Sequence, residues 1–205
     1  RIKGKTTYAM EGSIFIAGAG VQWLRDKLNF FKNASETENI VKSLKDNKGV
    51  YLVPAFTGLG APYWDANARG VLSGLTRDTG PKEIIRATIE SVAYQTYDLF
   101  EAMKHDGLRP KLVKVDGGMV MNNWFSQFLS DVVDIKVLRP RVQETTALGA
   151  AFMAGLQIGV YKSLKDISKN WQLDKDFTPK INSKNRKTLV KGWSAAIKKT
   201  LTKAI

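Results

Sequence analysis

The stretch Val115–Asn123, VDGGMVMNN, decides how the fold of this chain is predicted. It joins an apolar segment, Leu112–Val115, to a run with helical periodicity, which is the pattern of a turn between a strand and a helix. Gly117 and Gly118 leave the backbone bare at this turn, so a flat ring or a ribose can approach the main chain closely. Ligands of α/β sheets collect at this end of the strands. Taken alone, the stretch also fits a plain connector.

Asn122 and Asn123 stand at the start of the predicted helix. Asparagine is a favoured N-cap residue, because its side-chain oxygen accepts a hydrogen bond from the backbone of the first turn. We therefore expect one of the two either to cap the helix or to turn its amide toward a ligand.

A second glycine turn lies at Ala17–Asp26, AGAGVQWLRD. Gly18 and Gly20 open a predicted helix, and Gln22 follows near its positive end. Exposed N–H groups and a nearby amide suit a phosphate or a purine. A glycine-opened helix with an exposed glutamine explains the same residues equally well.

Short apolar or β-branched segments alternate with longer amphipathic ones along the chain. The segments with strand character are Thr7–Met10, Val50–Ala55, Val71–Leu75, Leu112–Val115 and Ile135–Leu138. The segments with helical character are Gly18–Leu28, Ser35–Leu44, Pro81–His105, Asn123–Val133, Thr145–Ile158, Leu164–Asn170 and Asn182–Lys203. This order predicts one α/β domain in which the later strands are parallel and are joined by helices.

Three local signals refine this prediction. Ser35 and Glu38 form the S-x-x-E pattern of a capping box. Pro81 suits the first position of a helix. The loop Thr57–Gly70 is long and rich in glycine, which is typical of a functional loop in a compact domain.

The composition limits the possible classes of protein. A chain of 205 residues with 43% hydrophobic residues can bury a real core. The absence of cysteine excludes disulfides and thiolate metal sites. No apolar run approaches the roughly 20 residues that span a bilayer, and the first residues do not form a signal peptide. We therefore expect a cytoplasmic protein without a membrane span.

The net charge of +13 would suit a nucleic-acid binder, but it is unevenly distributed. Eight basic residues and no acidic one follow Asp176, which leaves +5 for the rest of the chain. Most of these are lysines around a predicted helix whose apolar stripe is Leu189, Trp193 and Ile197. We predict a solvated helix face rather than a nucleic-acid site.

Several kinds of catalytic site are excluded or disfavoured. His105 is the only histidine, and it lies near the end of a long predicted helix, where a cation-capable side chain is favoured structurally. Neither a G-x-S-x-G elbow nor a Walker A motif is present. Asp131 and Asp134 are expected on the surface of a helix rather than as an acid/base pair.

Four segments in order resemble the C-terminal half of the FGGY carbohydrate kinases, and most closely of those that phosphorylate glycerol. They are YAMEGSIFIAGAGVQWLRD, GVYLVPAFTGLGAPYWDANARG, GLTRDTGPKEIIRATIESVAYQT and VDGGMVMNN. The resemblance is dense over residues 6–160. It implies an actin/hexokinase-like ATPase fold of the ribonuclease H type, with a mixed sheet flanked by helices. Residues 1–205 would be the C-terminal nucleotide-binding domain, with a basic helix at 181–205 and without the N-terminal substrate domain.

The resemblance also implies a function. The family transfers the γ-phosphate of ATP, and glycerol as acceptor would give glycerol 3-phosphate. Gly18, Gln22, Gly118 and Asn122 match the family positions that hold the adenosine side of ATP or ADP, and we expect Gly117, the other glycine of the pair, to belong to the same site. The catalytic base, the phosphate-gripping turns and the Mg²⁺ ligands would belong to the other half, so this chain alone is expected to be inactive. Family members are often homodimers or tetramers.

Three alternatives stay open at this point. The first is the same domain of a pentulose kinase or another polyol kinase. The second is a non-catalytic nucleotide-binding module with the actin-like fold. The third is a nucleic-acid binder that uses the lysine-rich end, and it would bind in a strongly salt-dependent way.

Overall fold

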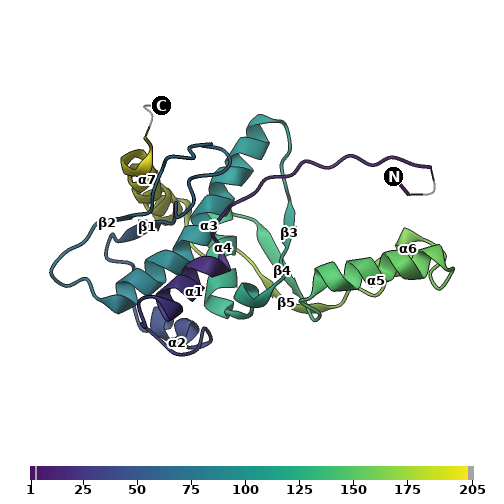
Figure 1. Ribbon diagram of the computed structural model, residues 1–205, viewed down its shortest axis with the longest axis horizontal. Coiled ribbons are helices and arrows are strands. Elements are labelled where there is room, and N and C mark those ends of the chain that lie inside the picture. The colour runs from purple at the N-terminus through teal and green to yellow at the C-terminus, as the bar shows by residue number, and fades with distance from the viewer. Residues whose placement is uncertain (3, 203–205) are drawn as a thin grey trace.

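A computed structural model describes residues 1–2 and 4–202 and shows helices packed around one long central helix, α3 (Pro81–His105) (Figure 1). Pro81 is its first residue, as predicted, and the Glu83 carboxylate accepts a hydrogen bond from the Gly80 N–H at 3.0 Å. Its buried face includes Ile85, Ile89 and Tyr94. The bounds of this helix are those predicted from the sequence.

Two small sheets flank α3. In the first, β1 (Tyr51–Val53) pairs with β2 (Val71–Ser73) in antiparallel fashion. In the second, β3 (Leu112–Lys114) pairs in parallel with β4 (Lys136–Pro140), and β4 pairs antiparallel with β5 (Leu173–Phe177). Between β3 and β4 lie the short 3₁₀ helix η1 (Gly118–Met121) and helix α4 (Asn123–Val133), which packs along α3. The predicted parallel crossover is therefore confirmed, within a mixed sheet.

The remaining helices divide into two groups. Helices α1 (Gly18–Asp26) and α2 (Glu36–Lys42) pack against α3, and α7 (Ser183–Thr200) packs against β1 and β2. Helices α5 (Thr145–Gln157) and α6 (Leu164–Ser168) instead extend away from this body, on the same side as the N-terminal arm (Figure 1). No helix within the described part of the chain combines the length and apolarity needed to cross a bilayer.

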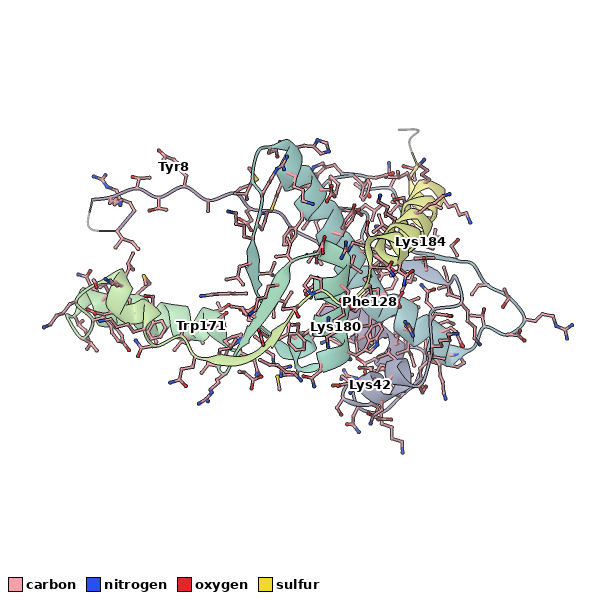
Figure 2. The ribbon with its side chains drawn as sticks, turned by 180° about the vertical axis from the view of Figure 1, so that it is seen from behind. Tyr8, Lys42, Phe128, Trp171, Lys180 and Lys184 are labelled. Carbon is pink, nitrogen blue, oxygen red and sulfur yellow. The ribbon has the colours of Figure 1, made fainter. Side chains whose placement is uncertain are left out.

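The core joins α3, α4 and α7 through aromatic rings. The ring of Tyr94 stacks on that of Trp193 at 5.3 Å and meets the edge of Phe128 at 5.6 Å. Trp193 is fully buried and Ile197 nearly so, which confirms the apolar stripe predicted for this helix. The lysines of α7 are exposed, as Lys184 illustrates in Figure 2.

Two predictions about elements are wrong, and one strand was not predicted. The segment Thr7–Met10 is not a strand, since no described strand lies beside it to supply ladder hydrogen bonds, and Tyr8 is 90% exposed (Figure 2). The basic helix covers only Ser183–Thr200, and Lys203 lies outside the described residues. Strand β5 was missed, because LDKDF buries only its last residue and shows no hydrophobic alternation.

Two predictions about side chains are also wrong. Ser35 forms no cap hydrogen bond, because Glu36 instead accepts from the N–H of Asn33 at 2.7 Å and Glu38 turns away toward α4. Asp131 is buried rather than on the surface, since its carboxylate accepts from the Lys180 N–H at 2.6 Å. The exposed Asp134 pairs with Arg186.

Asp98 ties the loop Thr57–Gly70 to the core. Its Oδ2 accepts hydrogen bonds from the Tyr63 hydroxyl at 2.8 Å and from Trp193 Nε1 at 2.7 Å. Burial raises the pKa of Asp98 from 3.8 to about 6, although both hydrogen bonds oppose this shift. Between these pH values the folded chain therefore holds the proton more tightly than the unfolded chain, so stability falls as pH rises through this range.

The Asp98→Asn variant is expected to flatten this dependence. An asparagine oxygen can accept the same two hydrogen bonds without a charge. The loss of unfolding free energy between pH 4 and pH 6, on the order of 2–3 kcal/mol in the parent, should therefore be largely absent. Urea unfolding across this range measures it, and parallel curves for the two proteins would show that Asp98 does not titrate there.

Candidate functional site

A pocket of about 450 Å³ opens where α1, α2 and η1 meet beside α3. It is lined by Gly18, Val21, Gln22, Arg25, Ala34, Ser35, Thr37, Glu38, Ile89, Gly118, Met119, Met121 and Asn122. Of the five residues predicted from the sequence as a site, four line this pocket, although they come from two turns about 100 residues apart. The fifth, Gly117, precedes Gly118 in the same turn.

Helix α1 supplies one wall. Gly18 is its first residue, and a Cβ atom there would meet nothing within 4 Å, so the bare backbone faces open space. Gln22 follows one turn later with an exposed side chain, and Arg25 lies one further turn along the same face. Gly20 has a different role, because a Cβ there would lie 3.0 Å from Thr88 Cγ2 and would separate α1 from α3.

The turn after β3 supplies a second wall. Gly117 has a left-handed φ of 82°, which favours glycine, and its N–H donates to the Gln143 carbonyl at 3.2 Å. Gly118 is not left-handed, and a Cβ there would also enter open space. Gly117 therefore shapes the turn, while Gly118 leaves room in the pocket.

Asn122 caps α4 and also lines the pocket. The sequence left these two roles open as alternatives. Its Oδ1 accepts a hydrogen bond from the Phe125 N–H at 3.0 Å, so it is the N-cap of α4. Its Nδ2 lies 3.4 Å from Thr37 Oγ1 on the facing wall, among the residues that line the pocket. Its side chain thus combines a structural oxygen with an amino group directed across the pocket.

The third wall, formed by α2, was not predicted. Glu38 accepts hydrogen bonds from the N–H of Asn123 at 3.2 Å and from its Nδ2 at 3.3 Å, and it pairs with Lys42. Partial burial opposes ionisation of Glu38, but the hydrogen bonds from Lys42 and Asn123 outweigh it and lower its pKa. The pocket therefore has an anionic edge on α2. The capping-box pattern of Ser35 and Glu38 predicted only a local helix cap, so nothing in the sequence indicated that α2 lines a pocket.

The pocket suits a flat, partly polar molecule. Its apolar lining includes Val21, Ile89 and Met119, and its amide groups come from Gln22 and Asn122. Largely apolar walls with a few placed polar groups are typical of small-molecule sites. Such a surface can bind a heteroaromatic ring and orient it, but its lining includes no histidine to serve as a general base.

The other titratable candidates lie outside this pocket. Asp116 accepts a hydrogen bond from Thr145, and Asp65 accepts from the Thr202 N–H at 2.7 Å, so both carboxylates have structural partners. His105 is the last residue of α3 and is exposed. Within the described residues, no group of three or more His, Cys, Asp or Glu side chains could hold a metal ion.

Known proteins of one kind are similar to this chain. The family model described as "FGGY family of carbohydrate kinases, C-terminal domain" matches residues 2–158. Glycerol kinase 1 of Pseudomonas aeruginosa is 53% identical over 204 residues, which are 100% of this chain and 41% of that protein. Glycerol kinase of Alteromonas mediterranea is 54% identical over 197 residues, covering 96% of this chain and 40% of that protein. The chain thus spans about two fifths of the length of these relatives.

Solved structures agree in fold. The crystal structure of Plasmodium falciparum glycerol kinase with ADP superposes with a TM-score of 0.84 at 36% identity, and the match covers 94% of this chain and 38% of that chain. Ligand-bound xylulose kinase from Lactobacillus acidophilus superposes with a TM-score of 0.76 at 25% identity, covering 91% of this chain and 38% of that chain.

Proposed function

Because the chain belongs to the FGGY family of carbohydrate kinases and carries its C-terminal domain, we propose that the pocket between α1, α2 and η1 binds the adenosine part of ATP or ADP. The actin/hexokinase-like ATPase fold expected from the sequence is confirmed by the kinases on which the chain superposes. The whole enzyme is proposed to transfer the γ-phosphate of ATP to glycerol, giving glycerol 3-phosphate.

One observation carries the nucleotide assignment. Gly18 and Gln22 belong to one turn and Gly118 and Asn122 to another, about 100 residues away in the sequence, and these four residues line one pocket. Bare main chain at the two glycines gives a ribose or purine room to approach. The ADP in the solved glycerol kinase structure supports the same ligand class for this pocket.

Glycerol as the acceptor rests on similarity. Glycerol kinases match this chain at 53% and 54% identity, whereas the xylulose kinase structure matches at 25%. A pentulose kinase is the second candidate, and it is disfavoured by this difference. The acceptor itself would be bound outside the pocket described above.

The domain contributes binding and orientation rather than chemistry. Phosphoryl transfer depends on positioning and on stabilising the charge of the transferred group. Val21, Ile89 and Met119 would exclude water from the nucleoside, and the amides of Gln22 and Asn122 would fix its orientation. Mg²⁺ would neutralise the phosphates, but the lining of this pocket has no suitable ligand set, so we assign Mg²⁺ to no residue of this chain.

If this domain binds the nucleotide and other residues perform the phosphoryl transfer, the chain alone should bind ADP but should not turn over ATP. Isothermal titration should detect ADP binding to the 205-residue chain, whereas a coupled assay with ATP, Mg²⁺ and glycerol should detect no ADP release. A full-length enzyme that contains this domain should show a higher kcat/KM for glycerol than for xylulose.

Each outcome tests a different part of the proposal. Turnover by this chain alone would contradict the assignment of the chemistry to other residues. A folded chain that binds no ADP would contradict the nucleotide pocket. Preference of the full-length enzyme for xylulose would contradict glycerol as acceptor, and no turnover with any polyol would favour a non-catalytic module.

A further inference from the structure

Arg139 on β4 binds the backbone of η1 without lining the pocket itself. It is only 6% exposed, and its Nη1 donates hydrogen bonds to the carbonyl oxygens of Val120 at 2.8 Å and Met121 at 3.3 Å. Both carbonyls belong to the four-residue η1, which also presents Gly118 to the pocket. Arg139 itself does not line the pocket, so it reaches the site only through the backbone it binds.

Strand β5 anchors the guanidinium. The Nε of Arg139 lies 2.7 Å from Asp174 Oδ2, and the Cζ of Arg139 lies 5.7 Å from the centre of the Phe177 ring. The register between β4 and β5 shifts at Arg139 and Pro140. Such irregularities re-aim a side chain, which fits the direction of Arg139 toward η1. The salt bridge, the ring and the two carbonyls together fix the planar group.

Asn123 connects this arginine to the α2 wall. Arg139 Nη2 donates to Asn123 Oδ1 at 3.3 Å, while the backbone N–H and Nδ2 of Asn123 donate to Glu38 at 3.2 Å and 3.3 Å. Two facing walls of the pocket, η1 and α2, are therefore linked through one asparagine.

We propose that Arg139 is a positioning residue for the nucleotide, which fixes η1 and, through Asn123, its spacing from α2. The inference rests on the proposed function. It deepens that function, because it assigns binding free energy to a residue that touches no ligand. A pocket held open in its binding conformation avoids the cost of ordering it when the ligand arrives.

The Arg139→Lys variant separates positioning from charge. Lysine keeps the charge and can keep the pair with Asp174, but one ammonium lacks the planar fork that serves two carbonyls and an amide together. ADP affinity should fall about fivefold to tenfold, the net effect of losing roughly one ordinary hydrogen bond. Amide hydrogen exchange at η1 should rise in the absence of ligand, while exchange in the core of α3 stays unchanged.

The Lys136→Met variant is the matched control. Lys136 lies on the same strand and pairs with Asp176 of β5 at 2.6 Å, but it is exposed and does not contact η1. This variant should keep the ADP affinity and the exchange pattern of the parent. If Arg139→Lys does not fold, Asp174→Asn removes the anchor from a partly exposed position and should still raise exchange at η1.

The two readouts distinguish this proposal from the proposed function. Unchanged ADP affinity and unchanged exchange at η1 in a folded Arg139→Lys variant would overturn the positioning role. Equal rises in exchange throughout the chain would show a general effect on stability and would also overturn it. A parent chain that binds no ADP would contradict the nucleotide pocket, while the exchange data would still decide whether Arg139 holds η1.

Discussion

The Arg86→Met variant is expected to lose about 3–5 kcal/mol of unfolding free energy at neutral pH, because it leaves a buried charge without its partner. Glu90 is 1% exposed, and its Oε1 lies 2.7 Å from Arg86 Nε. Only Asn47 Nδ2 at 2.9 Å and the Tyr94 hydroxyl at 3.3 Å would remain as donors. Arg86 Nη1 also binds the Leu44 carbonyl at 2.7 Å, so the variant loosens the chain just after α2. Urea unfolding measures the loss.

The pH dependence and a double variant identify the cause. Burial raises the pKa of Glu90, so falling pH protonates it and should reduce the difference between the variant and the parent. Adding Glu90→Gln to Arg86→Met removes the charge and should restore part of the stability. If the double variant is no more stable than Arg86→Met, the unpaired charge is not the cause. Arg25→Met, which breaks an exposed pair with Asp26, should change the unfolding midpoint little.

The sequence predicted those elements whose signals are local. Helix α3 begins at Pro81 and α4 begins after the capping Asn122, and both helices have the predicted bounds. Each carries an apolar face along several turns, so periodicity and capping agree. Where local conformational preference and burial favour the same structure, a single sequence is enough to predict the bounds of a helix or strand.

The elements that were predicted wrongly or missed depend on partners far away in the sequence. Strand β5 is defined by its pairing with β4 and not by its own alternation, and the segment Thr7–Met10 has strand composition without a described partner strand. Glu38 illustrates the same limit within the site. Its local spacing from Ser35 predicted a cap, but its carboxylate binds Asn123, which is 85 residues away in the sequence. Tertiary contacts override local propensity in each case.

Two of the three walls of the pocket were therefore predictable. Gly18, Gln22, Gly118 and Asn122 lie in two turns with recognisable composition, and a family resemblance connected the two turns. The α2 wall and Arg139 have no such pattern, since their relation to the pocket exists only after β4 and α2 have packed around α4. Residues that position a site without touching the ligand are therefore recognised from the structure and not from a sequence motif.

Replacing Gly118 with valine is expected to weaken ADP binding by at least about tenfold, or roughly 1.4 kcal/mol. A Cβ at Gly118 would meet no atom within 4 Å and its φ is not left-handed, so the backbone tolerates the change. The two added methyl groups would instead occupy the space that the proposed nucleoside needs. Gly117→Val would be a poorer test, because its φ of 82° would add strain. Titration with ADP measures the effect.

Gly149→Val is the matched control for Gly118→Val. Gly149 is also surrounded by open space and is not left-handed, but it lies on α5, which extends away from the body that contains the pocket (Figure 1). Its ADP affinity should equal that of the parent. Both variants should unfold at nearly the parent's urea midpoint, because an added Cβ at either position meets no atom within 4 Å. If Gly118→Val binds ADP as tightly as Gly149→Val while both are folded, the nucleoside does not lie against η1, and the site must be sought elsewhere on this domain.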